Sequence, residues 1–149
     1  MLRKGDQAPD FELSDQTGQP VKLSGLLRNG PVVLYFYPAD FTPVCTREAC
    51  AFRDRHEDLS NLDVAIVGIS PQNQASHRRF AETYGVPFPL LCDTDKTVIR
   101  AYGVDGPLGL GVRRVTYLID RERTITNRAV SDIFLGSHLA LIEEVLSQP

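Results

Sequence analysis

The sequence predicts an α/β fold with a mixed sheet. Two runs rich in β-branched and aromatic residues, 31–38 and 63–70, have the apolar character of strands buried on both faces. Each is followed by a helical segment, whereas the later runs 115–120 and 125–131 flank a charged turn, as the strands of an antiparallel pair do. Because strands and helices alternate first and a hairpin comes late, we expect parallel and antiparallel strands in one sheet.

The chain is predicted to begin with a short hairpin and to reach its core at the first buried strand. Residues 10–26 alternate apolar and polar side chains around a turn at Gly18. After the buried strand, a helix is predicted over about 43–57. Thr42 is the candidate N-cap of this helix, and Pro43 occupies its first position, where the missing N–H is tolerated. Strand, turn and helix therefore follow one another directly.

The second half of the chain contains shorter elements. A helix over 73–85 is closed by Gly85, a residue that favours the left-handed conformation found after helix ends. The remaining predicted elements are a short strand over 86–93, a short helix over 94–104, a flexible loop over 106–112, and an amphipathic helix over 137–146 with Leu139, Ile142 and Leu146 on one face.

Length and composition limit the organisation and the class of protein. A chain of 149 residues, 42% hydrophobic and 23% charged, can bury one real core, so we expect a single domain over residues 1–149. The net charge is −3 and the 16 basic residues are scattered, which argues against nucleic-acid or anionic-membrane partners. Residues 1–11 carry charge without an apolar stretch behind them, and no window approaches the roughly 18 apolar residues of a membrane span. We expect a cytoplasmic protein.

Three cysteines, Cys45, Cys50 and Cys92, indicate thiol chemistry. An odd count suits catalytic thiols in a reducing compartment better than a framework of structural disulfides. Zinc binding is the alternative, but the spacing C-x4-C, with His56 six residues beyond Cys50, lacks the paired knuckles of structural zinc. We therefore expect neither a metal nor another cofactor.

Cys45 lies in the first turn of the helix predicted after the first buried strand. Free backbone N–H groups and the positive end of the helix dipole would face its sulfur and favour the thiolate, which is a nucleophile. Cys50 follows five residues later and offers a nearby thiol to whatever forms on Cys45. This segment therefore predicts redox catalysis.

Pro38, Thr42 and Cys45 stand in the pattern P-x-x-x-T-x-x-C, which resembles the active-site signature of the peroxiredoxins, thiol peroxidases on a thioredoxin-like fold. The run FTPVCTREAC is similar to the PrxQ, or bacterioferritin-comigratory-protein, branch, in which a resolving cysteine lies five residues after the peroxidatic one. The stretches GDQAPDFEL, FPLLCD and RVTYLID also match. The resemblance thus covers almost the whole chain.

The resemblance implies a role for each residue of this segment. Cys45 would attack the peroxide O–O bond and become a sulfenic acid, and Cys50 would resolve it as an intrachain disulfide. Thr42 would hydrogen-bond the thiolate and the incoming peroxide, and Pro38 would help shape the pocket and shield the sulfur from solvent. The substrates would be hydrogen peroxide and organic hydroperoxides, and the reductant a thioredoxin-like dithiol.

Two residues elsewhere follow from the same resemblance. The family's pocket arginine precedes a T-F/Y-x-I-D strand by two residues, and that register selects Arg114 over Arg113. Glu48 matches a position whose carboxylate helps to hold this arginine. Together with Thr42 and the backbone N–H groups of the turn, Arg114 would supply the donors that stabilise the charge developing on the peroxide oxygens. We expect a monomer or a weak homodimer.

The five-residue spacing of Cys45 and Cys50 implies motion. On an ideal α-helix, residues five apart have Cα atoms about 8.7 Å apart, from a rise of about 7.5 Å and a turn of about 140°. A disulfide tolerates only about 4.4 to 6.8 Å. We therefore expect the first turns of the helix to unwind when Cys50 attacks oxidised Cys45.

For several residues a purely structural role or a surface position remains the alternative interpretation. Cys50 could be a core residue, which would leave a one-cysteine enzyme resolved by an outside thiol. Cys92 is expected to pack at a strand end, with a resolving or regulatory role as the alternative. Arg114 could be a surface charge. The histidines fall in charged helical contexts and are expected on the surface; they are His56, His77 and His138.

The rival function of another class is a peroxide-sensing relay protein, which would pass oxidation to a partner through the same thiols. Catalytic turnover of peroxide with a reductant separates an enzyme from a sensor, which is oxidised once and stoichiometrically.

Overall fold

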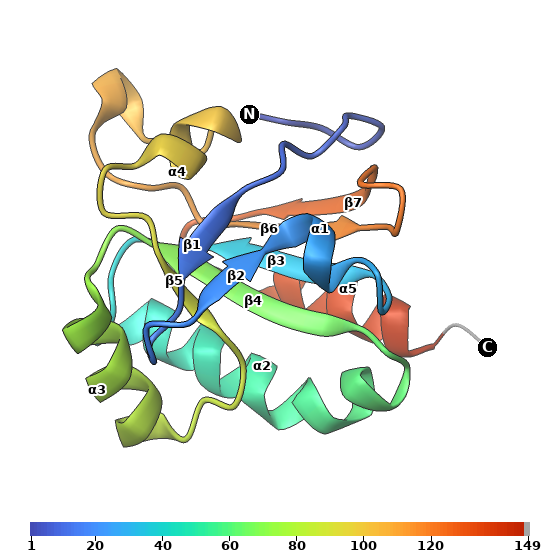
Figure 1. Cartoon of the computed structure of the whole chain (residues 1–149), viewed down its shortest axis with the longest axis horizontal. Coiled ribbons are helices and arrows are strands. Elements are labelled where there is room, and N and C mark those ends of the chain that lie inside the picture. Colours follow the sequence, from blue (N-terminus) through green and yellow to red (C-terminus); the bar gives the residue numbers. More distant parts are fainter. Residues whose placement is uncertain (148–149) are drawn as a thin grey trace.

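A computed structural model describes residues 1–147 as a central sheet between two layers (Figure 1). In chain order the elements are β1 (Glu12–Ser14), β2 (Pro20–Lys22), α1 (Leu23–Leu26), β3 (Val32–Phe36), α2 (Pro43–Asn61), β4 (Ala65–Ser70), α3 (Gln74–Tyr84), β5 (Leu90–Cys92), α4 (Thr97–Ala101), the 3-10 turn η1 (Pro107–Gly109), β6 (Val115–Ile119), β7 (Ile125–Val130) and α5 (Gly136–Leu146). The hairpin β1–β2, α1 and α4 lie on one face of the sheet, and α2, α3 and α5 on the other.

The sheet is mixed, as predicted. Its strand order is β5-β4-β3-β6-β7, in which β3, β4 and β5 run parallel, while β6 runs antiparallel to both β3 and β7. The early alternation of strands and helices produces the parallel half, and the late hairpin produces the antiparallel half. With helices on both faces and an N-terminal hairpin, this is a thioredoxin-like α/β fold.

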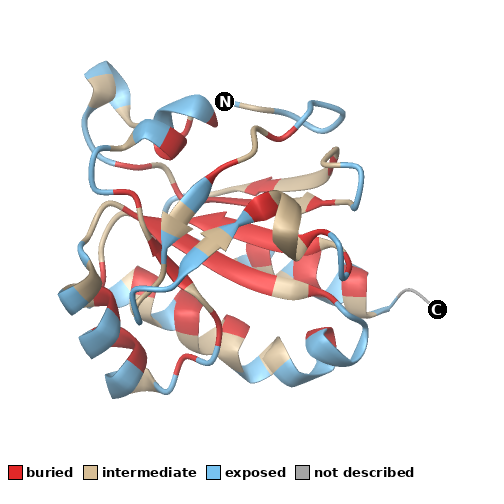
Figure 2. Ribbon diagram, in the orientation of Figure 1, coloured by how far each residue is buried: buried red, intermediate tan, exposed pale blue. Residues whose placement is uncertain are grey.

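Strand β3 is buried on both faces and divides the core in two. The side chains at even positions pack under the hairpin and α4; they are Val32, Leu34 and Phe36. Val33 and Tyr35 pack against the layer of α2, α3 and α5. All five residues of β3 are at most 1% exposed, which explains the unbroken apolar run in the sequence (Figure 2).

The pairing of β3 with β6 positions the residues that matter for function. Phe36 at the end of β3 pairs with Val115 at the start of β6. Arg114 therefore lies beside the turn that leads from β3 into α2. Consecutive residues of an extended chain point to opposite faces, so Arg114 turns into the layer of α2 while Arg113 remains near the surface.

Several predicted boundaries were wrong. Helix α2 continues past residue 57 to Asn61, because the charged residues there lie on its outer face while Leu59 stays buried. Strand β5 and helix α4 are shorter than the predicted 86–93 and 94–104. The predicted inner face of α5 is confirmed, since Ile142 is fully buried and Leu139 and Leu146 are partly buried against the same core. The buried positions also include His138, Leu141 and Val145.

The expectation that all three histidines lie on the surface was also wrong. His77 and His138 are both 0% exposed, and His56 is half-buried. The neighbours that suggested a solvated setting are charged, but they lie on the other side of each helix. His77 and His138 sit on the inner faces of α3 and α5.

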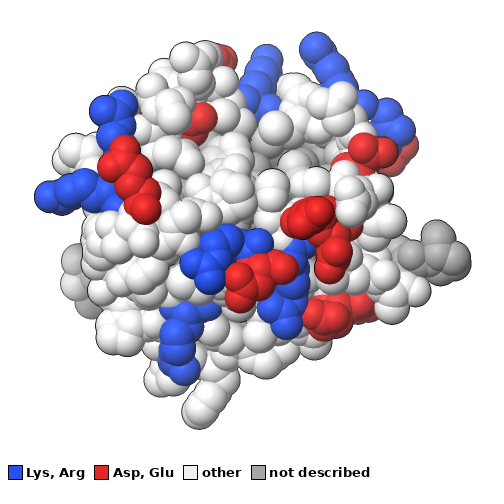
Figure 3. All heavy atoms as spheres, turned by 90° about the horizontal axis from the view of Figure 1, so that it is seen from below, with Lys and Arg blue, Asp and Glu red and all other residues white. Residues whose placement is uncertain are grey.

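The outer surface of the α2 layer carries charges of both signs side by side (Figure 3). Ion pairs on α2 join Arg53 to Asp54 and Arg55 to Glu143 of α5. Within residues 1–147, none of the helices combines the length and the apolar character that crossing a membrane requires.

Candidate active site

Cys45 occupies the first turn of α2 and is 1% exposed. Pro43 is the first helical residue, and the regular ladder begins with the bond from Thr46 N to Thr42 O. The early N–H groups of the helix and its positive dipole end therefore lie around the cysteine. This is the setting that the sequence predicts for a nucleophilic sulfur.

Arg114 lies against the Cys45 sulfur. Its Nη2 is 3.1 Å from Cys45 Sγ, its Nη1 donates to Glu48 Oε1 at 2.7 Å, and its Nε donates to the Asp132 carbonyl at 3.1 Å. The side chain is only 3% exposed. Since all three guanidinium nitrogens have partners, the positive charge is fixed in position next to the sulfur.

Glu48 lies one helical turn after Cys45, so both side chains face Arg114. Burial raises the pKa of Glu48 to about 7, although the charge and the hydrogen bond of Arg114 act in the opposite direction. Among residues 1–147, its second oxygen, Oε2, is buried without a hydrogen-bond partner. The carboxyl group thus orients the arginine while it is itself only partly satisfied.

His138 lies behind Glu48 on α5. Its Nε2 is 2.9 Å from the Ser131 carbonyl, which can only accept, so Nε2 carries a hydrogen. Burial lowers the pKa of His138 and favours the neutral ring. Its Nδ1 then accepts from the Thr116 hydroxyl at 2.7 Å and stands 3.8 Å from Glu48 Oε2. Sequence analysis missed His138 because its partners come from distant elements.

Asp132 is a second residue that sequence analysis missed. Its carboxylate accepts from the backbone N–H of Arg114 and from the side chain of Arg113, and its carbonyl accepts from Arg114 Nε. It follows β7, beside the start of β6, so only the sheet register brings it to the arginines. The choice of Arg114 over Arg113 agrees with this geometry, because Arg113 makes its ion pair at the surface.

Thr42 and Pro38 frame the turn before α2. Thr42 is the N-cap residue, but its hydroxyl donates to the Ala39 carbonyl at 2.8 Å instead of capping the helix. The oxygen of that hydroxyl retains lone pairs for an incoming donor. Pro38 is half-buried, and its carbonyl accepts from Gln72 at 3.1 Å. Their predicted roles toward the peroxide remain predictions.

All three cysteines are free thiols. Cys50 is half-buried on α2, which runs unbroken from Pro43–Asn61, so it lies at the helical spacing that a disulfide cannot bridge. Cys92 is the last residue of β5, and burial raises its pKa to about 11, which keeps it a thiol at neutral pH. These features favour a structural role for Cys92.

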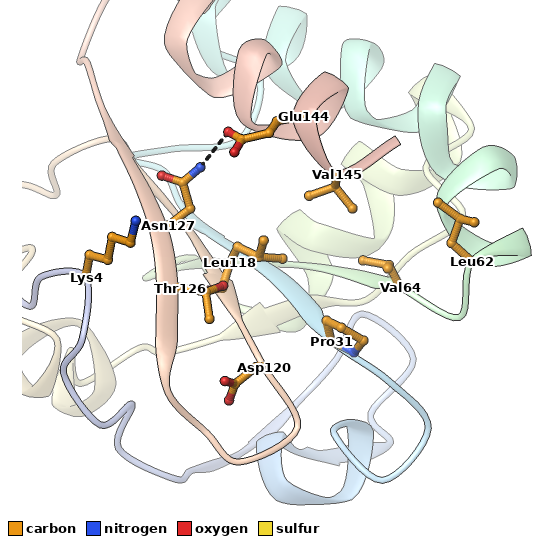
Figure 4. A pocket seen from close by; sticks show the side chains of 10 residues that line it. All are labelled: Lys4, Pro31, Leu62, Val64, Leu118, Asp120, Thr126, Asn127, Glu144 and Val145. Carbon is orange, nitrogen blue, oxygen red and sulfur yellow. Dashed lines mark hydrogen bonds between the residues drawn. The ribbon is translucent and has the colours of Figure 1, made fainter. Parts of the chain in front are cut away.

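A cavity of about 580 Å³ lies away from the site around Cys45 (Figure 4). Its lining includes Pro31 and Val64, which precede β3 and β4, and Asp120, which follows β6. Cys45 instead follows β3, so the cavity is at the opposite end of the sheet. None of the residues predicted to act on peroxide lines it.

A thioredoxin-like fold whose buried cysteine at a helix N-terminus is held by an arginine defines a class, the thiol-dependent oxidoreductases. Within that class, residues 4–128 match the AhpC/TSA family, and the chain belongs to this family. It is 44% identical over 124 residues to Peroxiredoxin Bcp of Bacillus subtilis, across 79% of this chain and 78% of that protein. It is 40% identical over 149 residues to the chloroplastic Peroxiredoxin Q of Triticum aestivum, across 97% and 68%.

A solved structure agrees with these relatives. The crystal structure of peroxidoxin BcpB from Mycobacterium tuberculosis matches with a TM-score of 0.90 and 41% identity, covering 98% of this chain and 97% of that one. The predicted resemblance to the PrxQ and bacterioferritin-comigratory-protein branch is confirmed, and with it thiol peroxidase activity as the general function.

Proposed function

We propose that the protein reduces hydrogen peroxide and organic hydroperoxides through Cys45 and Cys50, with a thioredoxin-like dithiol as the final reductant. The observation that carries the proposal is the 3.1 Å contact between Arg114 Nη2 and Cys45 Sγ at the start of α2. A fixed cation at this place stabilises the thiolate and, in the transition state, the charge on the peroxide oxygens.

In the first step the Cys45 thiolate attacks one peroxide oxygen. An S–O bond forms, the O–O bond breaks, and the departing oxygen takes a proton from solvent to leave as water or an alcohol. Thr42 would accept a hydrogen bond from the bound peroxide, and Pro38 would limit solvent access to the sulfur. Glu48 would act through Arg114, whose guanidinium it orients at 2.7 Å.

In the second step the Cys50 thiol attacks the Cys45 sulfenic acid, a disulfide forms and water leaves. The dithiol reductant then returns both cysteines to thiols by two exchanges and becomes a disulfide itself. Because Cys45 and Cys50 sit on one continuous helix, the first turns of α2 must unwind for this step. A reducing compartment such as the cytoplasm would supply the dithiol.

The test is the intact mass, with free-thiol counting, of wild type and of three variants after one equivalent of hydrogen peroxide. Wild type and Cys92→Ser are expected to lose two hydrogens, Cys50→Ser to trap a sulfenic acid, and Cys45→Ser to stay unchanged. If Cys50→Ser still forms an intrachain disulfide and Cys92→Ser does not, Cys92 is the resolving residue and the proposed second step is wrong.

A further inference from the structure

A second buried charged cluster adjoins the turn before α2 and has no part in the proposed chemistry. Asp40 lies in this turn and His77 lies on α3, and their side chains are 1% and 0% exposed. Asp40 Oδ2 is 2.6 Å from His77 Nδ1. Buried charges are costly unless they are paired and hydrogen-bonded, so a buried charged pair at this place suggests a specific structural role.

The hydrogen-bond geometry of this cluster suits an ion pair. His77 Nε2 is 3.0 Å from the Leu91 carbonyl, an acceptor, so that nitrogen carries a hydrogen. The Asp40 carboxylate accepts from the Tyr37 hydroxyl at 2.7 Å and from the Ser76 hydroxyl at 2.8 Å as well as facing Nδ1. Both ring nitrogens thus face acceptors, and both carboxylate oxygens face donors, as in an imidazolium–carboxylate pair.

Burial alone would raise the pKa of Asp40, but the hydrogen bond and charge of His77, with the hydroxyls of Tyr37 and Ser76, outweigh it and lower that pKa. The carboxylate is therefore ionised at neutral pH. Besides His77, the titratable groups around it include Tyr35 of β3, Tyr37 just after that strand and Cys92 of β5, all of which remain neutral because burial raises their pKa values.

The cluster ties the turn to three neighbouring elements. The backbone N–H of Asp40 donates to Gln72 Oε1 at 3.1 Å, and Gln72 Nε2 donates to the Pro38 carbonyl at 3.1 Å. Gln72 follows β4, His77 belongs to α3, and Leu91 belongs to β5. The bonds of Gln72 and of His77 Nδ1 end on Pro38 or Asp40, and Leu91 is reached through His77 Nε2. Cys45 follows Asp40 by only five residues.

Phe41 adds strain and a second anchor at the same place. Its φ is 65°, in the left-handed region that bulky side chains avoid, so the surrounding contacts must impose it. Its ring packs edge-on against Phe80 of α3 with centroids 5.2 Å apart. The turn is therefore fastened to α3 through Asp40 and through the strained residue itself.

We propose that Asp40 and His77 are a positioning pair that holds the 38–42 turn on α3, and thereby sets the balance between the folded site that reacts with peroxide and the unwound α2 in which Cys50 reaches Cys45. The inference rests on the proposed two-cysteine function for its kinetic part. The pair lies at the turn that precedes the part of α2 proposed to unwind. By holding this turn, it keeps Cys45 beside Arg114.

Hydrogen exchange of the reduced protein tests the positioning without any peroxide. In Asp40→Asn, amides of residues 39–46 are expected to exchange about tenfold faster or more, because a hydrogen bond between charged groups is lost. Amides of β3 and β6 should be unchanged. The graded control is Tyr37→Phe, which removes one neutral donor from the same carboxylate and keeps the ion pair, so its effect should be smaller.

The double variant Asp40→Asn/His77→Gln replaces both charges and avoids an unpaired buried one, so it is expected to fold even if the single variant does not. It too should open the turn selectively. Equal exchange in the turn for wild type and the variants would overturn the proposal. Equal acceleration throughout the core would also overturn it, because that result shows a purely global stabilising role.

Rapid-mixing kinetics with hydrogen peroxide test the consequence. In the Asp40→Asn/His77→Gln protein, sulfenic acid formation at Cys45 should slow about tenfold, while the following disulfide formation should become faster than in wild type. A fold-wide defect would slow both steps, and that result counts against the pair as a positioning device. If wild type itself forms no disulfide, the proposed function fails, and the exchange result still decides whether the pair holds the turn.

Discussion

Two buried charged clusters flank the turn before α2, and they differ in how completely their polar atoms are satisfied. In the Asp40 cluster, both carboxylate oxygens accept hydrogen bonds from described donors. In the Arg114 cluster, one arginine nitrogen faces a thiol sulfur, and Glu48 Oε2 has no partner within residues 1–147. The first arrangement suits a fixed anchor, whereas the second keeps capacity for a substrate and for rearrangement.

The difference follows from what each cluster contacts. Asp40 and His77 join a turn to α3 and β5, elements that do not change in the proposed cycle. Arg114 and Glu48 meet at α2, whose first turns would have to unwind in that proposed cycle. A partly satisfied network costs less to open than a complete one, so the incomplete cluster suits the side that would move in the proposed cycle.

The largest effect is expected from removing the cation of the incomplete cluster. Arg114→Met should lower the second-order rate constant for oxidation of Cys45 by about a hundredfold to a thousandfold, since it removes a donor placed where charge develops. The rate is measured by rapid mixing with hydrogen peroxide in a Cys50→Ser background. Arg113→Met is the matched control, because that guanidinium pairs with Asp132 at the surface. Equal losses in the two variants would contradict the distinction between the arginines.

A second prediction concerns the pH dependence of stability. The pKa of Glu48 is about 7 in the folded protein and 4.5 as its ordinary value. Between these values the folded state holds the proton more tightly, so this contribution to the free energy of unfolding is fully present below pH 4.5 and is lost as the pH rises through about 7. It amounts to at most about 3 kcal/mol.

Urea unfolding of wild type and Glu48→Gln between pH 4.5 and pH 8 measures this contribution. The wild type should lose stability relative to the variant as the pH rises, because glutamine cannot ionise. Parallel curves for the two proteins would show that Glu48 does not titrate with a raised pKa. Glu57→Gln, on the exposed side of α2, controls for the change of charge on this helix.

Much of the fold could be predicted from the sequence, because its signals are local. The apolar run of β3, the N-terminal proline of α2 and the left-handed Gly85 after α3 each report on their own surroundings. The motif also identified Cys45 and the arginine that the structure brings to it. Each of these two residues stands at a fixed distance in sequence from a recognisable local motif.

The buried polar clusters could not be predicted in this way. His77 faces Asp40, which is 37 residues away in sequence, and His138 faces Thr116, which is 22 residues away. His77 is followed by two arginines, and the helix of His138 carries Glu143 and Glu144, which indicated a surface position for both. Only the packing of α3 and α5 on the sheet decides that they point inward, and no local pattern encodes that orientation.

The contrast between the two clusters is tested most directly by hydrogen exchange of the reduced and the peroxide-oxidised wild-type protein. In the oxidised form, amides 43–53 should lose protection as α2 unwinds to join Cys45 and Cys50, while amides of α3 that carry the His77 anchor keep theirs. Near-identical protection of residues 43–53 in both redox states, with the Cys45–Cys50 disulfide present in the oxidised sample, would contradict the account.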